Sequence, residues 1–358
     1  MRGDFAHFRP RPVGGQGETG RSAVSCAPAL TTATGPEAVS GKLSSPGQLG
    51  RRGFLAAAAS LPIARAANRV TPQPRSGTPG LIGATITPAA MNCRNWPTAV
   101  TAFDWQAGVP MATSCSRMYW SEGQWQTGPN EPLPVAERAA ECATMVLSFR
   151  PPRGPFRQAA ADALQRSIKR CQQAGANIES VVLWHEFNDF ALRRPPFPTP
   201  GEYHRYCWDY GPAVTELGVS LGYMPVVLST LGPAQLAYFP GTERDGSRLV
   251  SRIYADYYCR AQYAEGVRMD ACLELARRHG LPLGLGEFGG TNGHQRASDQ
   301  LFARFMNYLT GVFADRLDKG LDNAACMYFC GGPANVPTVA QYDALGRFYN
   351  SVAASPGS

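Results

Sequence analysis

The sequence predicts a (β/α)8 barrel that begins near residue 81, and three observations support this fold class. Short apolar runs rich in β-forming residues alternate with longer helical stretches. Eight such runs recur at intervals of about 35 residues, a normal length for a strand, a crossover helix and their loops. The runs in the middle of the series are apolar throughout, as expected of parallel strands that are covered on both faces.

The predicted strands are residues 81–87, 116–120, 143–149, 179–185, 224–230, 249–258, 281–287 and 324–330. An open doubly wound sheet is the alternative. It would normally have fewer units and often a glycine-rich phosphate loop after the first strand, and "GATITPAAMN" is not such a loop. The series of eight therefore favours the closed barrel.

Three of the helices predicted between these strands end at a glycine. They cover residues 156–175, 269–280 and 312–320. A glycine closes a helix in the left-handed conformation without a Cβ clash. Basic residues gather in the last turns of these helices, where the helix dipole favours positive charge.

The first 67 residues differ in character from the rest of the chain. Residues 1–50 are rich in Gly, Pro, Ser, Thr and Ala and have no sustained apolar period, which indicates a disordered leader. In "GRRGFLAAAASLPIARAA", Arg51 and Arg52 precede an apolar stretch of about eleven residues and a small-residue cleavage site. This pattern resembles a twin-arginine export signal.

The apolar stretch of this predicted signal falls far short of the roughly 20 residues that a membrane span needs. We therefore expect no stable membrane anchor and secretion into the periplasm or the medium. The predicted organisation is a leader and signal over 1–67, a linker over 68–80 and a barrel domain over 81–355.

Composition and charge exclude several classes of function. The chain carries a net charge of +7, but the leader and signal hold eight of its 34 basic and three of its 27 acidic residues, so the remainder is close to neutral. The remainder has no dense Lys/Arg run, so we expect no nucleic-acid partner. Ten cysteines and five histidines show no metal-ligand spacing, so we predict no metal and no cofactor. Nine of the cysteines lie beyond residue 66, so at least one would stay unpaired if the others formed disulfides.

Two glutamates stand at the ends of predicted strands. Glu186 ends the fourth run in "LWHEFND", and Glu287 ends the seventh in "LGLGEFGG". Strands four and seven lie across the mouth of a barrel, at the end where such enzymes have their active sites. A lone glutamate there would be interpreted as a helix cap or a rim salt bridge. Two of them with aromatic neighbours predict a catalytic pair, which at a separation of about 5–5.5 Å can supply a nucleophile and an acid/base for glycoside hydrolysis.

These two segments resemble those of retaining glycoside hydrolases of the large (β/α)8 clan A. "WHEFND" is similar to the Trp-His-Glu-Met-Asn-Gly segment of family 26, the β-mannanase family, and "LGLGEFGG" is similar to the nucleophile segment of the clan. The resemblance implies that Glu186 is the acid/base, that Glu287 is the nucleophile and that His185 matches the substrate-site histidine before the acid/base. The family has Arg where this chain has Val182, and a Trp that residues 189–200 lack. These departures favour a relative that acts on a different β-linked sugar.

The same resemblance implies contacts to the nucleophile from strands two and six. Many clan members hold it with an arginine from strand two and a tyrosine from strand six. Arg117 and Tyr258 stand at fitting places, with Tyr254 and Tyr257 as alternatives for the tyrosine. A rim salt bridge is the alternative for Arg117, and core packing is the alternative for the tyrosines.

Several aromatic residues are predicted to contact sugar. Trp120 follows strand two and Trp184 precedes the acid/base, and flat rings of this kind stack on sugar faces. The clan commonly supplies a Trp floor from strand eight, and here the candidates are Tyr328 and Phe329. We take Tyr328 as the predicted substrate contact.

The sequence therefore predicts a secreted retaining glycoside hydrolase that cleaves a β-linked polysaccharide or oligosaccharide. The alternative from a different class is a non-catalytic glycan-binding or cell-surface barrel protein, which would not need both carboxylates. "HEFND" lacks the second histidine of HExxH, and no serine stands in a GxSxG elbow. Zinc proteases and serine hydrolases are therefore disfavoured.

Overall fold

The structure is a computed structural model. The residues that it describes are 77–121, 124–128, 131–132, 141–152, 154–185, 187, 198–227, 236–244, 246–291 and 296–353. All of them belong to one compact unit, Thr71–Ser358. The predicted leader and signal lie outside them, so export stays a prediction. Within these ranges, no helix has both the length and the apolar character that a membrane crossing requires.

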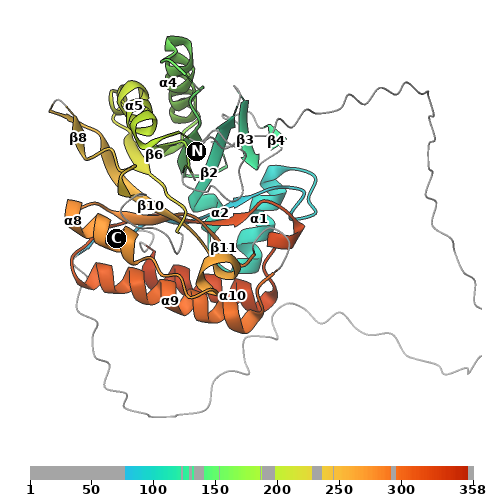
Figure 1. Cartoon of the computed structure of the whole chain (residues 1–358). Coiled ribbons are helices and arrows are strands. Elements are labelled where there is room, and N and C mark those ends of the chain that lie inside the picture. The colour runs from blue at the N-terminus through green and yellow to red at the C-terminus, as the bar shows by residue number, and fades with distance from the viewer. Residues whose placement is uncertain are drawn as a thin grey trace, which may run out of the picture. The chain divides into compact units, whose positions relative to one another are not determined.

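Eight parallel strands form a near-closed barrel with helices interleaved between them (Figure 1). From the second barrel strand to the eighth, successive strands pair with one another, and the eighth pairs with the first. The junction between the first two strands is bridged where the Arg117 backbone N–H donates to Thr85 Oγ1 at 3.3 Å. This topology confirms the predicted (β/α)8 fold. The barrel strands are β1 (Ile82–Ile86), β2 (Cys115–Ser121), β5 (Thr144–Phe149), β6 (Asn177–Leu183), β7 (Ser220–Tyr223), β10 (Val250–Tyr258), β11 (Leu283–Gly289) and β12 (Asn323–Cys330).

Shorter strands lie outside the barrel. They are β3 (Gln124–Gly128) and β4 (Glu131–Pro132), which extend the sheet from β2, and β8 (Glu243–Arg244) and β9 (Ser247–Arg248), which form a separate hairpin. The helices are α1 (Trp96–Ala107), α2 (Met111–Ser114), α4 (Gln158–Gln173), α5 (Pro200–Tyr210), α6 (Pro212–Thr215), α8 (Asp270–His279), α9 (Asp299–Asp318) and α10 (Val339–Val352), with a π-helix η1 (Cys259–Tyr263) and a 3-10 helix η2 (Pro333–Asn335).

The three predicted helix stops lie where expected. Gly175, Gly280 and Gly320 follow α4, α8 and α9 with φ values of 94°, 60° and 73°. The predicted helix over 312–320 is the last part of the longer α9. The left-handed glycines turn each helix back toward the next strand.

The fifth strand differs from the prediction. It was expected over 224–230, of which residues 228–230 lie outside the described ranges. In the described part, β7 covers Ser220–Tyr223, and the chain then continues through a single bridge between Val226 and Asp256. Pro225 has no N–H to donate, so it interrupts the ladder that the apolar pattern suggested.

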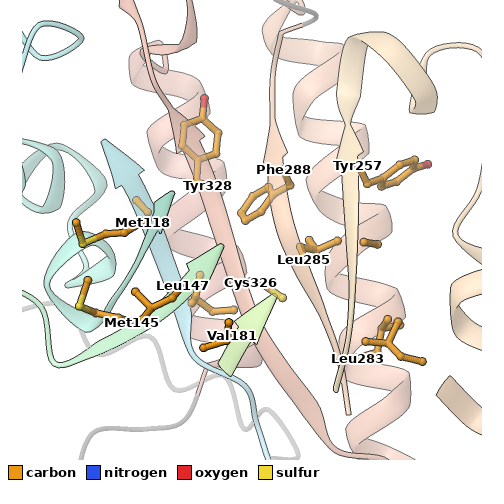
Figure 2. Close-up of a cluster of buried hydrophobic side chains, with 14 of the residues drawn as sticks. Met118, Met145, Leu147, Val181, Tyr257, Leu283, Leu285, Phe288, Cys326 and Tyr328 are labelled. Atoms are coloured by element: carbon orange, nitrogen blue, oxygen red, sulfur yellow. The ribbon is translucent and has the colours of Figure 1, made fainter. Parts of the chain in front are cut away.

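The buried side chains form two clusters that the barrel wall separates. Side chains on the inner face fill the barrel. Those on the outer face pack against the helices, and Figure 2 shows part of this outer cluster. Because side chains alternate along a strand, the face that a residue occupies decides whether it can reach the barrel mouth. The inner cluster consists of Cys115, Val146, Val182, Met224, Tyr254, Ala324, Ala325 and Met327.

None of the nine cysteines within the described ranges forms a disulfide. Eight of them are buried and Cys93 is half-buried. Burial raises the pKa of Cys171, of Cys272 and of Cys330 to about 12 in each case. These thiols are therefore protonated and protected from reagents in the folded protein.

Candidate active site

An irregularity in β11 directs Glu287 into the barrel mouth. Leu285 packs in the outer cluster, so strict alternation would also turn Glu287 toward the helices. However, Leu285 lies opposite Ala255 of β10, and Glu287 lies opposite the next residue of that strand, so Gly286 is an extra residue. This bulge reverses the alternation. Phe288 packs outward, and Glu287 faces the site.

Three side chains from two other strands donate hydrogen bonds to the Glu287 carboxylate. Arg117 Nη1 donates to Oε1 at 3.0 Å, and the Tyr119 hydroxyl donates to the same oxygen. The Tyr258 hydroxyl donates to Oε2. Glu287 is 6% exposed, and Arg117 is fully buried. Donors on both oxygens fix the carboxylate and stabilise a negative charge on it.

The structure thus brings together three of the predicted site residues, Arg117, Tyr258 and Glu287. Tyr119 was not predicted. It follows Arg117 by two residues on β2, and residues at that spacing share one face of a strand. This spacing was the signal that could have identified it.

The two alternatives for Tyr258 lie elsewhere. The Tyr254 hydroxyl lies 2.6 Å from Ser180 Oγ in the barrel interior. The Tyr257 side chain points outward, and its hydroxyl donates to the Val267 carbonyl. Neither contacts Glu287 in the described structure.

Arg117 has further partners besides Glu287. Its Nε donates to Ser148 Oγ at 2.8 Å, and its Nη1 donates to the Gly286 carbonyl at 3.0 Å. The same Nη1 lies 3.7 Å from Asp256 Oδ1 in an ion pair that is buried on both sides. Burial opposes the charge of this guanidinium, but the electrostatic effect of Tyr119, Glu287 and Asp256 outweighs it and raises the Arg117 pKa.

The two tyrosines act as donors over a wide pH range. Burial raises the pKa of Tyr119 and of Tyr258 well above the usual value of a phenol. The negative charge of Glu287 raises both values further, because a tyrosinate beside a carboxylate is unfavourable. Both hydroxyls therefore keep their protons at neutral pH and can donate to Glu287.

The segment after β6 approaches this cluster through His185. The His185 ring packs edge-on against the Tyr119 ring, with 5.2 Å between the ring centroids. His185 is thus next to the tyrosine that donates to Glu287. Glu186, the predicted acid/base, lies outside the described residues.

Trp184 occupies a different position from the one predicted. Its ring is 4% exposed and stacks on Tyr206 at 5.3 Å, and Arg150 lies over it at 5.7 Å. This burial corrects the predicted sugar-stacking role to a packing role. Trp184 has a φ of 48°, a left-handed conformation that is rare for a bulky residue. The chain therefore turns sharply just before the predicted acid/base.

Tyr328 also lies away from the mouth, which contradicts its predicted role as a substrate contact. It is 1% exposed, and its ring lies near that of Phe103 in the outer cluster. Figure 2 shows it beside Phe288. Its hydroxyl donates to the Asn335 carbonyl at 2.8 Å. Alternation along β12 turns Tyr328 toward the helices and places the half-buried Phe329 on the other face.

The remaining predictions concern Trp120 and metal ligands. The backbone of Trp120 lies in β2 and pairs with Trp125 of β3, but its side chain lies outside what the structure describes. Within the described ranges, no group of three or more His, Cys, Asp or Glu side chains could hold a metal ion.

Sequence comparisons return no matching protein family and no matching curated protein. Solved barrel structures do match. A family 128 endo-β-1,3-glucanase from Amycolatopsis mediterranei, in complex with laminaritriose and laminaribiose, is 16% identical over 77% of this chain and 100% of its own, with a TM-score of 0.43. A family 30 endoxylanase from Clostridium papyrosolvens is 16% identical over 78% and 72%, with a TM-score of 0.45.

A family 26 endo-β-1,4-mannanase from Bacillus sp. JAMB-750 is 12% identical over 78% of this chain and 94% of its own, with a TM-score of 0.44. By their names, all three are glycoside hydrolases, and each is similar to this chain at an identity of 16% or less. Because all three TM-scores are below 0.5 and all three identities are below 25%, these similarities assign no activity to this chain.

Proposed function

We propose that this protein is a retaining glycoside hydrolase and that Glu287 is its nucleophile. The observation that supports the proposal is the set of donors from Arg117, Tyr119 and Tyr258 on one carboxylate at the carboxyl end of the barrel. A glutamate that caps a helix would accept from backbone N–H groups. The donors found here are side chains from two other strands, which suits a carboxylate that must be oriented and charged before substrate arrives.

In this proposal, one Glu287 oxygen attacks the anomeric carbon while Glu186 protonates the leaving oxygen. The bond from sugar to leaving group breaks, and a glycosyl ester of Glu287 forms. Glu186 then removes a proton from water, which attacks the same carbon and releases Glu287. The three donors favour this second step, because they stabilise the charge that returns to the carboxylate.

The role of Glu186 is proposed from its place in the sequence and from its neighbour. His185 directly precedes it and packs on Tyr119, which donates to Glu287. The substrate is proposed to be a β-linked glycan, because the segments around both glutamates resemble those of clan A enzymes.

The test is turnover of β-linked polysaccharides and activated aryl glycosides by three variants. Glu287→Gln keeps the shape of the side chain and removes its charge, so it should abolish activity on both kinds of substrate. Glu186→Ala should lose activity on polysaccharide but keep measurable turnover of an aryl glycoside, and added azide should raise that rate. Glu265→Gln, at an exposed position, is the matched control and should behave as wild type.

Equal and mild losses for the two site variants on every substrate would contradict the mechanism. The non-catalytic glycan-binding protein would then be the better explanation.

We also propose that the chain is exported through the twin-arginine signal that its residues 50–67 resemble. Changing Arg51 and Arg52 to lysine should retain the protein in the cytoplasm. Cell fractionation measures this, and unchanged export of the double variant would refute the twin-arginine interpretation.

A further inference from the structure

The backbone of Tyr258 is held by a side chain from the turn that follows it. Tyr258 is the last residue of β10, and its hydroxyl donates to Glu287 Oε2. Its backbone N–H donates to the side chain of Gln262, with 2.7 Å between the nitrogen and Gln262 Oε1. The end of β10 is therefore fixed by a residue that lies four positions further along the chain.

The reach of Gln262 depends on the wide turn in which it lies. The chain passes from β10 directly into the π-helix η1, and Tyr258 is the extended residue before the first turn, with φ −109° and ψ 140°. The Ala264 N–H donates to the Cys259 carbonyl, five residues earlier, at 2.8 Å. In an α-helix, a Gln or Glu three residues after the capping residue can accept from the N–H of that residue. A π turn is one residue longer, so the same reach falls to the fourth residue, which is Gln262.

Gln262 is itself fixed in this turn. Its backbone carbonyl accepts from the N–H groups of Glu265 and Val267, at 3.2 and 3.1 Å. The residue is 7% exposed, and a buried amide side chain needs hydrogen bonds to offset its lost contact with water. The bond to the Tyr258 N–H supplies part of this compensation, so each residue stabilises the position of the other.

The ring of Tyr258 has little room to move independently of its backbone. A Cβ added at Gly289 of β11 would lie 3.3 Å from the Tyr258 Cε1, so the ring lies against the backbone of the neighbouring strand. Gly289 is also the residue opposite Tyr258 in the register of β10 and β11. Closely packed groups transmit displacements to one another. A shift at the end of β10 would therefore move the hydroxyl relative to Glu287 Oε2.

We propose that Gln262 is a positioning residue of the active site, which holds the end of β10 so that the Tyr258 hydroxyl can donate to Glu287. The inference rests on the proposed role of Glu287 as nucleophile. Gln262 acts through Tyr258 and does not need to touch the substrate. The π-helix is the part of the fold that gives Gln262 its reach, and π-helical turns are frequent at functional sites.

The experiment is a double-variant cycle on the turnover of an activated aryl glycoside. Gln262→Leu keeps a similar side-chain volume and removes the acceptor, so kcat/KM should fall by about 10–100-fold, the loss expected when a group at the site moves by up to about 1 Å. In a Tyr258→Phe background the same change should cost less than about threefold, because the hydroxyl that Gln262 positions is already absent. The same factor in both backgrounds would overturn the inference.

Two further variants of Gln262 support the cycle. Gln262→Met, an unbranched apolar side chain of similar length, should give the same losses, and it replaces Gln262→Leu if that variant does not fold. Gln262→Glu keeps an acceptor oxygen at the same reach, so it should retain clearly more activity than the Leu or Met variant. A Glu variant with no such advantage would contradict the positioning role.

Asp104→Ala is the matched control for a loss of stability. The Asp104 side chain also accepts from backbone N–H groups, at 2.6 Å from Ala112 and 3.1 Å from Thr113. These bonds lie just before the start of β2, at the amino end of the barrel strands and away from the mouth. The variant should lower the free energy of unfolding and leave kcat/KM unchanged.

The same cycle in urea unfolding needs no turnover. The losses in the free energy of unfolding from Gln262→Leu and Tyr258→Phe should add to less than their sum, because both weaken the bond to Glu287. Gln262→Leu and Tyr254→Phe should be additive, since the Tyr254 hydroxyl lies beside Ser180 Oγ inside the barrel. Coupling to Tyr258 in a protein that hydrolyses no glycoside would support the positioning and refute the proposed function. Additive losses with Tyr258→Phe would refute the positioning.

Discussion

Replacing Gly286 by alanine should both destabilise the barrel and misplace Glu287. Gly286 is the extra residue of the bulge that turns Glu287 into the mouth. A Cβ there would come closer than 3.0 Å to Met224 Sδ and Cε and would lie 2.6 Å from Asp256 Oδ1. No real Cβ makes such contacts, so the inner face of the barrel must move.

The free energy of unfolding should fall by about 1–3 kcal/mol, the usual cost of an overpacked core. The thioether end of Met224 can swing away, which keeps the loss within this range. The turnover rate of the folded variant should fall strongly even where the variant is still fully folded. A displacement of about 1 Å in a catalytic group can cost roughly 100-fold in rate. Urea unfolding and the turnover of an aryl glycoside measure the two effects.

A control and a double variant sharpen this test. Gly311 lies in the middle of α9 with nothing within 4 Å of an added Cβ. Gly311→Ala should therefore stabilise the protein by about 0.5–1 kcal/mol, through helix propensity alone. Met224→Ala combined with Gly286→Ala should cost less than the sum of the two single changes, since it removes two of the clashing atoms. Strict additivity, or a Gly286→Ala variant with wild-type stability and rate, would refute the packing argument.

Three further changes have expected outcomes. Arg117→Ala removes a cation that lies within 4 Å of the buried carboxylates of Asp256 and Glu287, so it should lower the free energy of unfolding by about 3–5 kcal/mol in urea titrations. Adding Glu287→Gln should recover part of this loss. Burial raises the pKa of Tyr119 and of Tyr258 in the folded state, so the free energy of unfolding should be intact below about pH 10 and fall as the pH rises further. Tyrosinate absorbance and circular dichroism should therefore change together. Formation of tyrosinate at these two residues in a folded protein would contradict the argument. Of the nine described cysteines, Cys93 alone should react with a thiol reagent in the native protein, and all nine should react after unfolding.

The fold could be predicted from the sequence because strands and helices leave local signals. Continuous apolar runs and terminal glycines repeat along the chain, and both reflect properties of single segments. The fifth strand was placed wrongly because Pro225 interrupts a run whose composition still resembles a strand. A missing N–H donor outweighs apolar composition at that point.

The site could be predicted only in part, because the face of a strand on which a side chain lies depends on register. Tyr328 was chosen over Phe329 on residue type, and alternation along β12 places Tyr328 on the helix side. Trp184 was expected to stack on sugar, but a left-handed turn directs its ring into the core. Asp256 was not identified, because its relation to Arg117 exists only after three strands have closed around it.

The backbone is irregular directly after β6 and within β11, and both irregularities lie close in sequence to a proposed catalytic glutamate. Within the described ranges, Trp184 and Asn92 are the non-glycine residues with positive φ, and Trp184 stands two residues before Glu186. On β11, the bulge at Gly286 directly precedes Glu287. A barrel wall gains no stability from a strained turn or an extra residue, since each interrupts the hydrogen bonds that hold the strands together. The bulge at Gly286 turns Glu287 out of the packing pattern of β11 and toward the donors from β2 and β10, which is what a site requires when it must orient a carboxylate.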